Sequence, residues 1–124
     1  MGASGRRHTH YADTQAYVTK DGSLVRELMH PLQHGVRSQS LAEAVVSPGG
    51  TTALHRHRIT EELYHVLEGT GMMTLASEKF AVGPGDTVCI APGTAHCIAN
   101  TGSAPLRILC CCTPAYRHDD TELL

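Results

Sequence analysis

Turn-forming residues divide this chain of 124 residues into short segments, and this division limits the possible folds more than any other feature of the sequence. Twelve glycines and six prolines are spread along the chain, and no segment between them keeps the apolar period of a helix. Short apolar or alternating segments predict strands instead, at residues 14–19, 24–29, 40–46, 51–57, 62–68, 72–75, 79–82, 87–91, 96–100 and 106–112. Many short strands at close spacing indicate an all-β domain, either a sandwich or a closed barrel.

Length and composition are those of a single globular domain. A chain of this length forms one domain over residues 1–124 and buries roughly two thirds of its unfolded surface. The contents of 41% hydrophobic and 18% charged residues are ordinary values for a soluble protein. The formal charge of −2 offers no electrostatic basis for binding nucleic acid or an anionic membrane surface.

The N-terminal residues and the hydropathy of the chain favour a cytoplasmic protein. Residues 1–10 are polar and are expected to be flexible, and they lack the apolar core of a secretory signal. No segment approaches the roughly 20 apolar residues of a membrane span. Arg6 breaks the N-terminal myristoylation pattern. We therefore expect no membrane partner.

The five cysteines are consistent with a reducing compartment. Cys110, Cys111 and Cys112 are consecutive in an apolar segment, where neighbouring side chains point to opposite faces and are poorly placed for a disulfide. Cys89 and Cys97 also lie in segments predicted to be strands. An odd number of cysteines without a CxxC pair favours buried thiols that act as small hydrophobic residues. The alternative is a thiolate metal site or a reactive cysteine.

Three histidines and one carboxylate stand out as candidate metal ligands. His55 and His57 are two positions apart, so both imidazoles point to the same face of an extended strand. Glu62 begins the next predicted strand, and His96 follows a Pro-Gly turn further along the chain. Two histidines with a carboxylate form the open ligand set of non-haem iron, and a further histidine also suits Mn, Ni, Cu or Zn. The sequence therefore predicts one divalent transition metal ion bound by these four residues.

These residues lie in two motifs that resemble those of the cupin superfamily. The first motif, G-x5-HxH-x4-E-x6-G, is matched over residues 49–69, and the second, G-x5-PxG-x2-H-x3-N, over residues 85–100. The second motif departs at Ala91, where the pattern has proline, but no ligand is lost. The chain thus resembles a small single-domain cupin of the conserved-barrel type 2 class. This resemblance implies one cupin β-barrel, a double-stranded β-helix or jelly roll, over nearly the whole chain.

Strand alternation separates the expected ligands from similar residues nearby. Glu62 and Tyr64 share one face, whereas Glu61 and His65 alternate with them and are expected to point outward. Asn100 is expected to be a turn or wall residue. The remaining histidines lie in predicted loops or tails and are expected to be solvated: His8, His10, His30, His34 and His118. In a cupin barrel the four predicted ligands would converge inside and leave metal positions open for water or substrate.

The reaction is less constrained than the metal site, because cupins include dioxygenases, decarboxylases, sugar isomerases, polyketide cyclases and non-catalytic binding proteins. We favour an enzyme that acts on a small organic molecule, by the chemistry of a non-haem-metal dioxygenase, because we expect an apolar barrel wall. The residues expected in this wall are Met72, Met73, Phe80, Ile90 and Ile98. The alternatives are a mannose-6-phosphate-isomerase-like enzyme and a protein that only binds a sugar or a carboxylate.

An isomerase would need a general base and a phosphate-binding group, and the sequence provides neither clearly. The candidate catalytic residues are Tyr64 and Glu43, followed by Glu27 and Tyr116. Arg56 and Arg58 alternate away from the ligand histidines, and Arg107 is alone in an apolar strand. This shortage of a base and of cationic residues disfavours a sugar-phosphate substrate.

The predicted sheets leave edge strands, which proteins tend to cover. We therefore expect a homodimer, with the N-terminal segment near Tyr11–Thr19 as the strand that pairs with the partner. The cupin resemblance agrees with this expectation, because small cupins commonly pair their sheets in this way.

Overall fold

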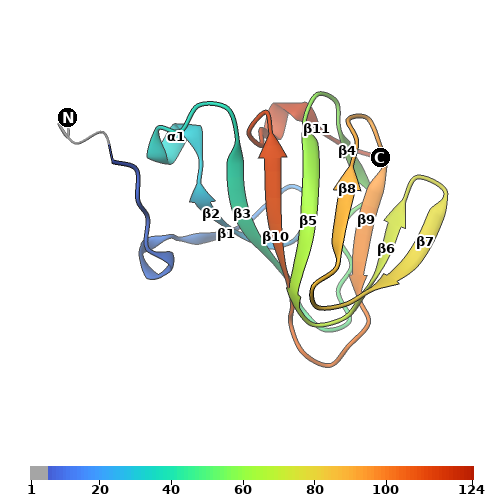
Figure 1. Ribbon diagram of the computed structural model, residues 1–124. Helices are drawn as coiled ribbons and strands as arrows, with labels where there is room; N and C mark the ends of the chain where they lie inside the picture. The colour runs from blue at the N-terminus through green and yellow to red at the C-terminus, as the bar shows by residue number, and fades with distance from the viewer. Residues whose placement is uncertain (1–5) are drawn as a thin grey trace.

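The computed structural model describes residues 6–124, which form two antiparallel β-sheets packed against each other (Figure 1). The six-stranded sheet has the order β1-β2-β3-β10-β5-β8, and the five-stranded sheet has the order β11-β4-β9-β6-β7. The strands are β1 (Ala16–Val18), β2 (Leu24–Met29), β3 (Ser40–Val46), β4 (His55–His57), β5 (Glu61–Glu68), β6 (Gly71–Leu75), β7 (Glu78–Val82), β8 (Thr87–Ile90), β9 (His96–Asn100), β10 (Leu106–Thr113) and β11 (Thr121–Leu123). This double-sheet barrel confirms the all-β fold predicted from the sequence.

The core lies between the two sheets and follows from strand alternation. Along β10 the buried positions are Leu106, Ile108, Cys110 and Cys112, at every second residue. Met73 on β6 and Ile98 on β9, 0% and 2% exposed, belong to the same core cluster from the other sheet. Burying these side chains stabilises the barrel by about 25 cal/mol for each Å² of apolar surface.

The largest difference from the predicted strands lies at the C-terminus. The sequence predicts a polar tail after Thr113-Pro114, but Thr121–Leu123 form β11, which pairs with β4. Three residues are too few to show a strand pattern, so the pairing with β4 rather than local sequence makes this strand. The C-terminal segment is therefore part of the five-stranded sheet.

Residues near α1 (Pro31–His34) also differ from the prediction of a solvated loop. Pro31 suits the first turn of a helix, and His30 Nδ1 accepts a hydrogen bond from Leu32 N at 3.2 Å. His30 is only 7% exposed, and its Nε2 donates to Tyr116 O at 2.8 Å. The expectation that His30 is solvated is therefore wrong, because this residue joins α1 to the C-terminal segment.

The N-terminal segment packs along the six-stranded sheet (Figure 1). The sequence predicts flexibility for residues 1–10. Residues 1–5 lie outside the described residues, whereas Thr9 Oγ1 donates a hydrogen bond to Leu28 O at 2.7 Å. Within Tyr11–Thr19, a 3-10 turn (Tyr11–Asp13) precedes β1, which pairs with β2 of its own chain and forms one edge of the sheet. No helix within residues 6–124 has the length and apolar character needed to cross a membrane.

Gly69, the last residue of the first motif, permits the tight connection between β5 and β6. Its φ of +86° lies in the left-handed region that favours glycine. A Cβ atom here would lie 2.6 Å from the carbonyl oxygen of Pro105, the residue before β10. This glycine is thus required for the packing of three chain segments at one end of the barrel.

Candidate metal centre

Two strands of the five-stranded sheet bring three histidines together. His55 and His57 point to the same side of β4, and His96, the first residue of β9, is the register partner of His55. One ring nitrogen from each of the three lies within 4.8 Å of the others. All three residues are buried, with exposures of 2%, 4% and 0%. The histidines predicted from the sequence as metal ligands are therefore adjacent in the structure.

Backbone carbonyl groups hold two of the rings through their Nδ1 atoms. His55 Nδ1 donates to Ala53 O at 2.7 Å, and His96 Nδ1 donates to Thr94 O at 2.9 Å. Because a carbonyl oxygen can only accept, Nδ1 carries the proton in both residues. In the neutral rings the lone pairs are therefore on Nε2, the atoms that face the cluster.

The third ring is held by β11, the strand that the sequence did not predict. His57 Nδ1 lies 2.9 Å from Thr121 Oγ1. Thr121 Oγ1 donates its own proton to Arg117 O at 2.9 Å, so it accepts from His57. Residues that orient a metal-binding histidine through its second nitrogen strongly affect metal affinity. The C-terminal segment thus sets the orientation of His57.

Glu62 on β5 lies beside two of the three histidines. Its Oε1 atom lies 3.0 Å from His57 Nε2 and 3.7 Å from His96 Nε2, and its Oε2 atom accepts a hydrogen bond from the Cys112 thiol at 3.3 Å. Burial alone would raise the pKa of this carboxyl group, but the nearby imidazole of His57 and, next, that of His96 outweigh burial and lower the pKa to about 2. Glu62 is therefore a carboxylate whose negative charge faces the histidines.

This set of atoms fits a divalent cation. His96 Nε2 is buried and has no hydrogen-bond partner among residues 6–124. A buried lone pair next to other lone pairs and a carboxylate is costly unless a proton or a cation lies between them. Imidazole nitrogens whose second nitrogen is hydrogen-bonded, together with a carboxylate, are suitable ligands for Fe, Mn, Ni, Cu and Zn.

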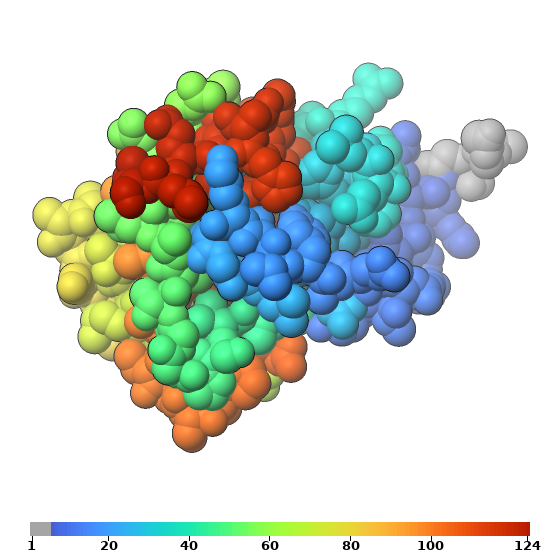
Figure 2. Space-filling view, turned by 180° about the vertical axis from the view of Figure 1, so that it is seen from behind, coloured from blue at the N-terminus to red at the C-terminus, as the bar shows by residue number. Residues whose placement is uncertain are grey.

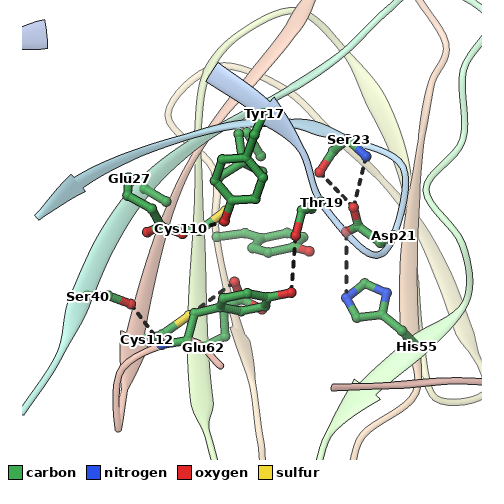
Figure 3. A pocket seen from close by; sticks show the side chains of 15 residues that line it. Tyr17, Thr19, Asp21, Ser23, Glu27, Ser40, His55, Glu62, Cys110 and Cys112 are labelled. Carbon is green, nitrogen blue, oxygen red and sulfur yellow. Dashed lines mark hydrogen bonds and ion pairs between the residues drawn. The ribbon is translucent and has the colours of Figure 1, made fainter. Parts of the chain in front are cut away.

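A cavity beside the histidines extends toward the six-stranded sheet (Figure 3). Its volume is about 40 Å³, enough for roughly three water molecules. Its polar lining comprises Tyr17, Thr19, Asp21, Ser23, Glu27, Ser40, His55, Glu62, Tyr64 and Tyr116, beside the thiols of Cys110 and Cys112. No lysine or arginine among the described residues lines it. The cavity is therefore small and rich in groups that accept hydrogen bonds.

The apolar part of this lining differs from the wall expected from the sequence. Val25, Ala42 and Ala44 line the cavity, whereas Met73, Phe80, Ile90 and Ile98 pack in or against the core elsewhere. Met72 is 39% exposed because it alternates with the buried Met73 on β6. The expectation that Met72 forms part of an inner wall is therefore wrong.

Asp21 is the cavity carboxylate that the sequence did not indicate. It lies in the turn between β1 and β2, and its Oδ2 atom is 3.7 Å from His55 Nε2. Its Oδ1 atom accepts hydrogen bonds from Ser23 N and Ser23 Oγ at 2.9 and 2.7 Å. The backbone of this turn is tied to the segment before β4, because Asp21 O accepts from Ala53 N at 2.8 Å. Figure 3 shows the Asp21 carboxylate directed at the imidazole of His55.

The two catalytic candidates from the sequence lie in different places. Tyr64 is buried in the cavity, with its ring centroid 5.9 Å from that of His96, and burial raises the pKa of its phenol well above the usual value. Glu43 lies instead in a separate hollow with Tyr11 and Arg107. It alternates along β3 with Ala42 and Ala44, which line the cavity. The structure does not bring Glu43 to the histidines.

The residues expected to point away from the cluster do so. Glu61 is exposed, and His65 Nδ1 lies 2.7 Å from Thr87 Oγ1 on the outer face of the sheet. Asn100 Nδ2 donates to Val46 O and Ala104 O, and its Oδ1 accepts from Gly102 N. These bonds make Asn100 part of a turn at the far end of β9, as the sequence predicts.

Known proteins of similar sequence and structure identify the family. Residues 42–112 match the family model described as Cupin domain. Protein MJ1618 of Methanocaldococcus jannaschii is 55% identical over 117 residues, which cover 94% of this chain and 93% of that protein. The polyketide cyclase RemF from Streptomyces resistomycificus has a TM-score of 0.75 at 27% identity, over 87% of this chain and 79% of that chain. The oxalate decarboxylase of Lactobacillus farciminis has a TM-score of 0.78 at 22% identity, over 93% of this chain and 35% of that one, a likeness of fold alone. The chain belongs to the cupin family.

Proposed function

We propose that this cupin is an enzyme that depends on one divalent transition metal ion and acts on a small organic molecule. The metal ligands are His55, His57, Glu62 and His96. The observation that carries this proposal is the cluster of three buried histidines, each with its Nδ1 proton already used, with Glu62 Oε1 beside the Nε2 atoms of His57 and His96. The bound metal, Fe, Mn, Ni, Cu or Zn, would act as a Lewis acid on a substrate oxygen.

The reaction class that the cavity supports best is proton transfer on a small carbonyl or hydroxyl compound. The sequence suggested that a base was lacking, but the Asp21 carboxylate lies beside His55 and lines the cavity. Ser23 holds one oxygen of this carboxylate and leaves the other directed at the cluster. A positioned carboxylate close to a substrate oxygen polarised by a cation is the arrangement that removes a proton from a neighbouring carbon. Similarity to the cyclase RemF supports an enzyme over a protein that only binds.

Exchange of substrate protons for deuterium tests this reaction class. The protein is purified without oxygen, its metal content is measured, and the metal-free form is loaded with Zn(II), Mn(II), Ni(II) or Fe(II). Small diketones and hydroxyketones are then incubated in D₂O under nitrogen and followed by NMR. We expect carbon-bound protons to exchange, or a product to form, with Zn(II) as well as with the redox-active ions.

Oxygen-dependent chemistry is the second candidate, a non-haem-metal dioxygenase. The observation that favours it is the ligand set itself, because four protein ligands leave coordination positions open for oxygen and substrate. The same metal-loaded proteins are then given air and a panel of diketones, thiols and catechols. This experiment distinguishes proton transfer from oxygen-dependent chemistry. Oxygen uptake that occurs only with a redox-active metal, without exchange under nitrogen, would favour the dioxygenase. Tight binding without any product would instead favour a binding protein.

A sugar-phosphate isomerase is the least favoured alternative. Among the described residues no lysine or arginine lines the cavity, whereas Asp21, Glu27 and Glu62 place carboxylates in it. Arg56 and Arg58 lie near Glu122, with which both form ion pairs outside the cavity. A dianionic phosphate would therefore meet negative charge without a cationic side chain to bind it.

We further propose a homodimer that forms through β1. Within residues 6–124 this strand pairs only with β2 and forms an edge of the six-stranded sheet, and Val18 on it is 70% exposed. A second copy could cover this edge by continuing the sheet. Light scattering at micromolar concentration should give the mass of two chains, and replacement of Val18 by Lys should favour the single chain. A single-chain mass for the unaltered protein would contradict the proposal.

A further inference from the structure

The carboxylate of Glu27 lies where the metal-side cavity meets a second, larger hollow. Glu27, Tyr17 and Tyr116 line both spaces. The outer hollow has a volume of about 430 Å³ and is also lined by His30, Leu32, Gln33 and residues 117–119. Figure 2 shows the segments that surround it, the blue N-terminal hairpin, the cyan α1 region and the red C-terminal segment, next to one another on one face. Glu27 therefore stands between the molecular surface and the histidines.

Only one oxygen atom of this carboxylate has a hydrogen-bond partner within residues 6–124. Glu27 Oε2 accepts from Tyr17 OH at 2.8 Å. Glu27 Oε1 is buried and accepts no hydrogen bond from the described residues, and the residue is 5% exposed. A buried carboxylate oxygen without a donor carries a large desolvation cost. A group that supplies a donor at this position would remove that cost.

Glu43 provides an internal comparison, because it is also a buried glutamate bonded to a tyrosine. It is 7% exposed, and its Oε1 accepts from Tyr11 OH at 2.5 Å. The guanidinium of Arg107 lies 3.7 Å from the same oxygen. Glu43 thus has both a hydroxyl donor and a cation, whereas Glu27 forms no ion pair with the residues that the structure describes. Of these two glutamates, therefore, Glu27 is the one that lacks a donor, and it is the one that lines the cavity.

We propose that Glu27 Oε1 binds an N–H or O–H donor of the ligand and thereby selects its chemical class. This inference rests on the proposed function for the other end of the ligand, an oxygen atom that reaches the metal ligands. The metal-side cavity has three carboxylates and no lysine or arginine among its described lining residues, and Arg117 in the outer hollow is paired with Asp119. A positively charged amine is therefore the preferred donor, ahead of a neutral hydroxyl. A carboxylate at this end is disfavoured, because it would face Glu27, and the guanidinium of Arg117 in the outer hollow is already paired with Asp119.

Three compounds of equal chain length test the selection. They are 4-amino-1-butanol, 1,4-butanediol and 4-hydroxybutyrate, which share one hydroxyl group and differ only at the opposite end. Binding is followed by NMR titration of the full chain, both metal-free and loaded with Zn(II). We expect affinity to fall in that order, with roughly tenfold or more between the amine and the carboxylate. Equal affinities, the reverse order or no binding by any of the three would overturn the proposal.

Two variants and one matched control assign the effect to Glu27. In Glu27→Gln the preference for the amine over the diol should disappear, whereas in Glu43→Gln it should be unchanged. Tyr17→Phe keeps the carboxylate and removes its internal donor, so the preference should persist, and its loss would also overturn the proposal. Tyr17→Phe tests the proposal if Glu27→Gln fails to fold. If the protein binds no metal and its metal-free form still prefers the amine, the proposed function is refuted, whereas the selection by Glu27 is supported.

Discussion

Two groups of side chains meet at the cavity, and hydrogen bonds hold both in a similar way; of the three histidines, His55 lines the cavity itself. On the histidine wall (His55, His57 and His96), each ring is held through Nδ1 and presents a neutral lone pair. On the N-terminal wall (Asp21 and Glu27), each carboxylate has one oxygen held by serine or tyrosine donors and presents the other. Neutral lone pairs next to Glu62 suit a metal ion, whereas anionic oxygens suit a proton or a donor group of a ligand. Under the proposed function, the first wall binds the metal and the second wall contacts the substrate.

Removing one ring of the histidine wall should have the largest effect. We expect His57→Ala to abolish metal binding, because one of the four ligands is lost. A metal present at about 100 times its dissociation constant stabilises the folded chain by about 2.7 kcal/mol. Chelation should therefore lower the melting temperature of the unaltered protein and leave that of His57→Ala unchanged. Elemental analysis gives the metal content of each protein.

Glu61 supplies the control for this experiment, because it is an exposed carboxylate next to the predicted ligand. Glu61→Gln should bind metal as the unaltered protein does, and Glu62→Gln should lose it. The opposite result, with metal lost from Glu61→Gln and retained by Glu62→Gln, would show that the wrong carboxylate has been assigned.

The next largest effect is expected on the N-terminal wall. Asp21→Asn keeps the shape of the side chain and removes the proton acceptor, so the rate of proton exchange or turnover should fall by about 10²–10⁴-fold. Metal content should be unchanged, because this wall is not assigned to the metal. Asp13→Asn, an exposed aspartate in the 3-10 turn, is the control. If Asp21→Asn loses its metal, Asp21 is a ligand and the two walls do not have separate roles.

A smaller effect should follow from loosening one ring without removing it. Thr121→Val removes the hydroxyl that accepts from His57 Nδ1, and we expect metal affinity to fall by about 10–100-fold. Thr87→Val is the matched control, because Thr87 Oγ1 lies 2.7 Å from the Nδ1 atom of His65, outside the cavity. Metal titration should show no change for the control, and equal affinities in both variants would mean that the position of His57 does not depend on β11.

The histidine wall could be predicted from the sequence because its residues lie in strands with clear alternation. Two positions separate His55 from His57, and the pattern of β5 turns Glu62 inward and Glu61 outward. These are local features. The sequence therefore predicted the fold and a set of candidate ligands, and the structure brings the three candidate histidines together with Glu62 beside two of them.

The N-terminal wall and the support of His57 could not be predicted in this way. Asp21 lies in a Lys-Asp-Gly-Ser turn, and turn residues do not indicate which part of the barrel the turn will cover. The hydrogen bond from Ala53 N to Asp21 O, which joins segments far apart in the chain, fixes that position. Thr121 is in a three-residue strand that exists through its pairing with β4. These contacts depend on the tertiary structure rather than on a local pattern.

Cys112 lies between the two walls, and its substitution should have the smallest effect. Burial and, next, the charge of Glu62 raise the pKa of this thiol, which donates its proton to Glu62 Oε2 at 3.3 Å. Cys112→Ala should retain one metal ion per chain and lose about 1 kcal/mol of stability in urea, because a small buried group is removed. Cys89 is exposed, so Cys89→Ala should change stability by less than about 0.5 kcal/mol. Loss of metal from Cys112→Ala would instead identify a thiolate ligand, and the metal could then not be assigned to the histidine wall and Glu62 alone.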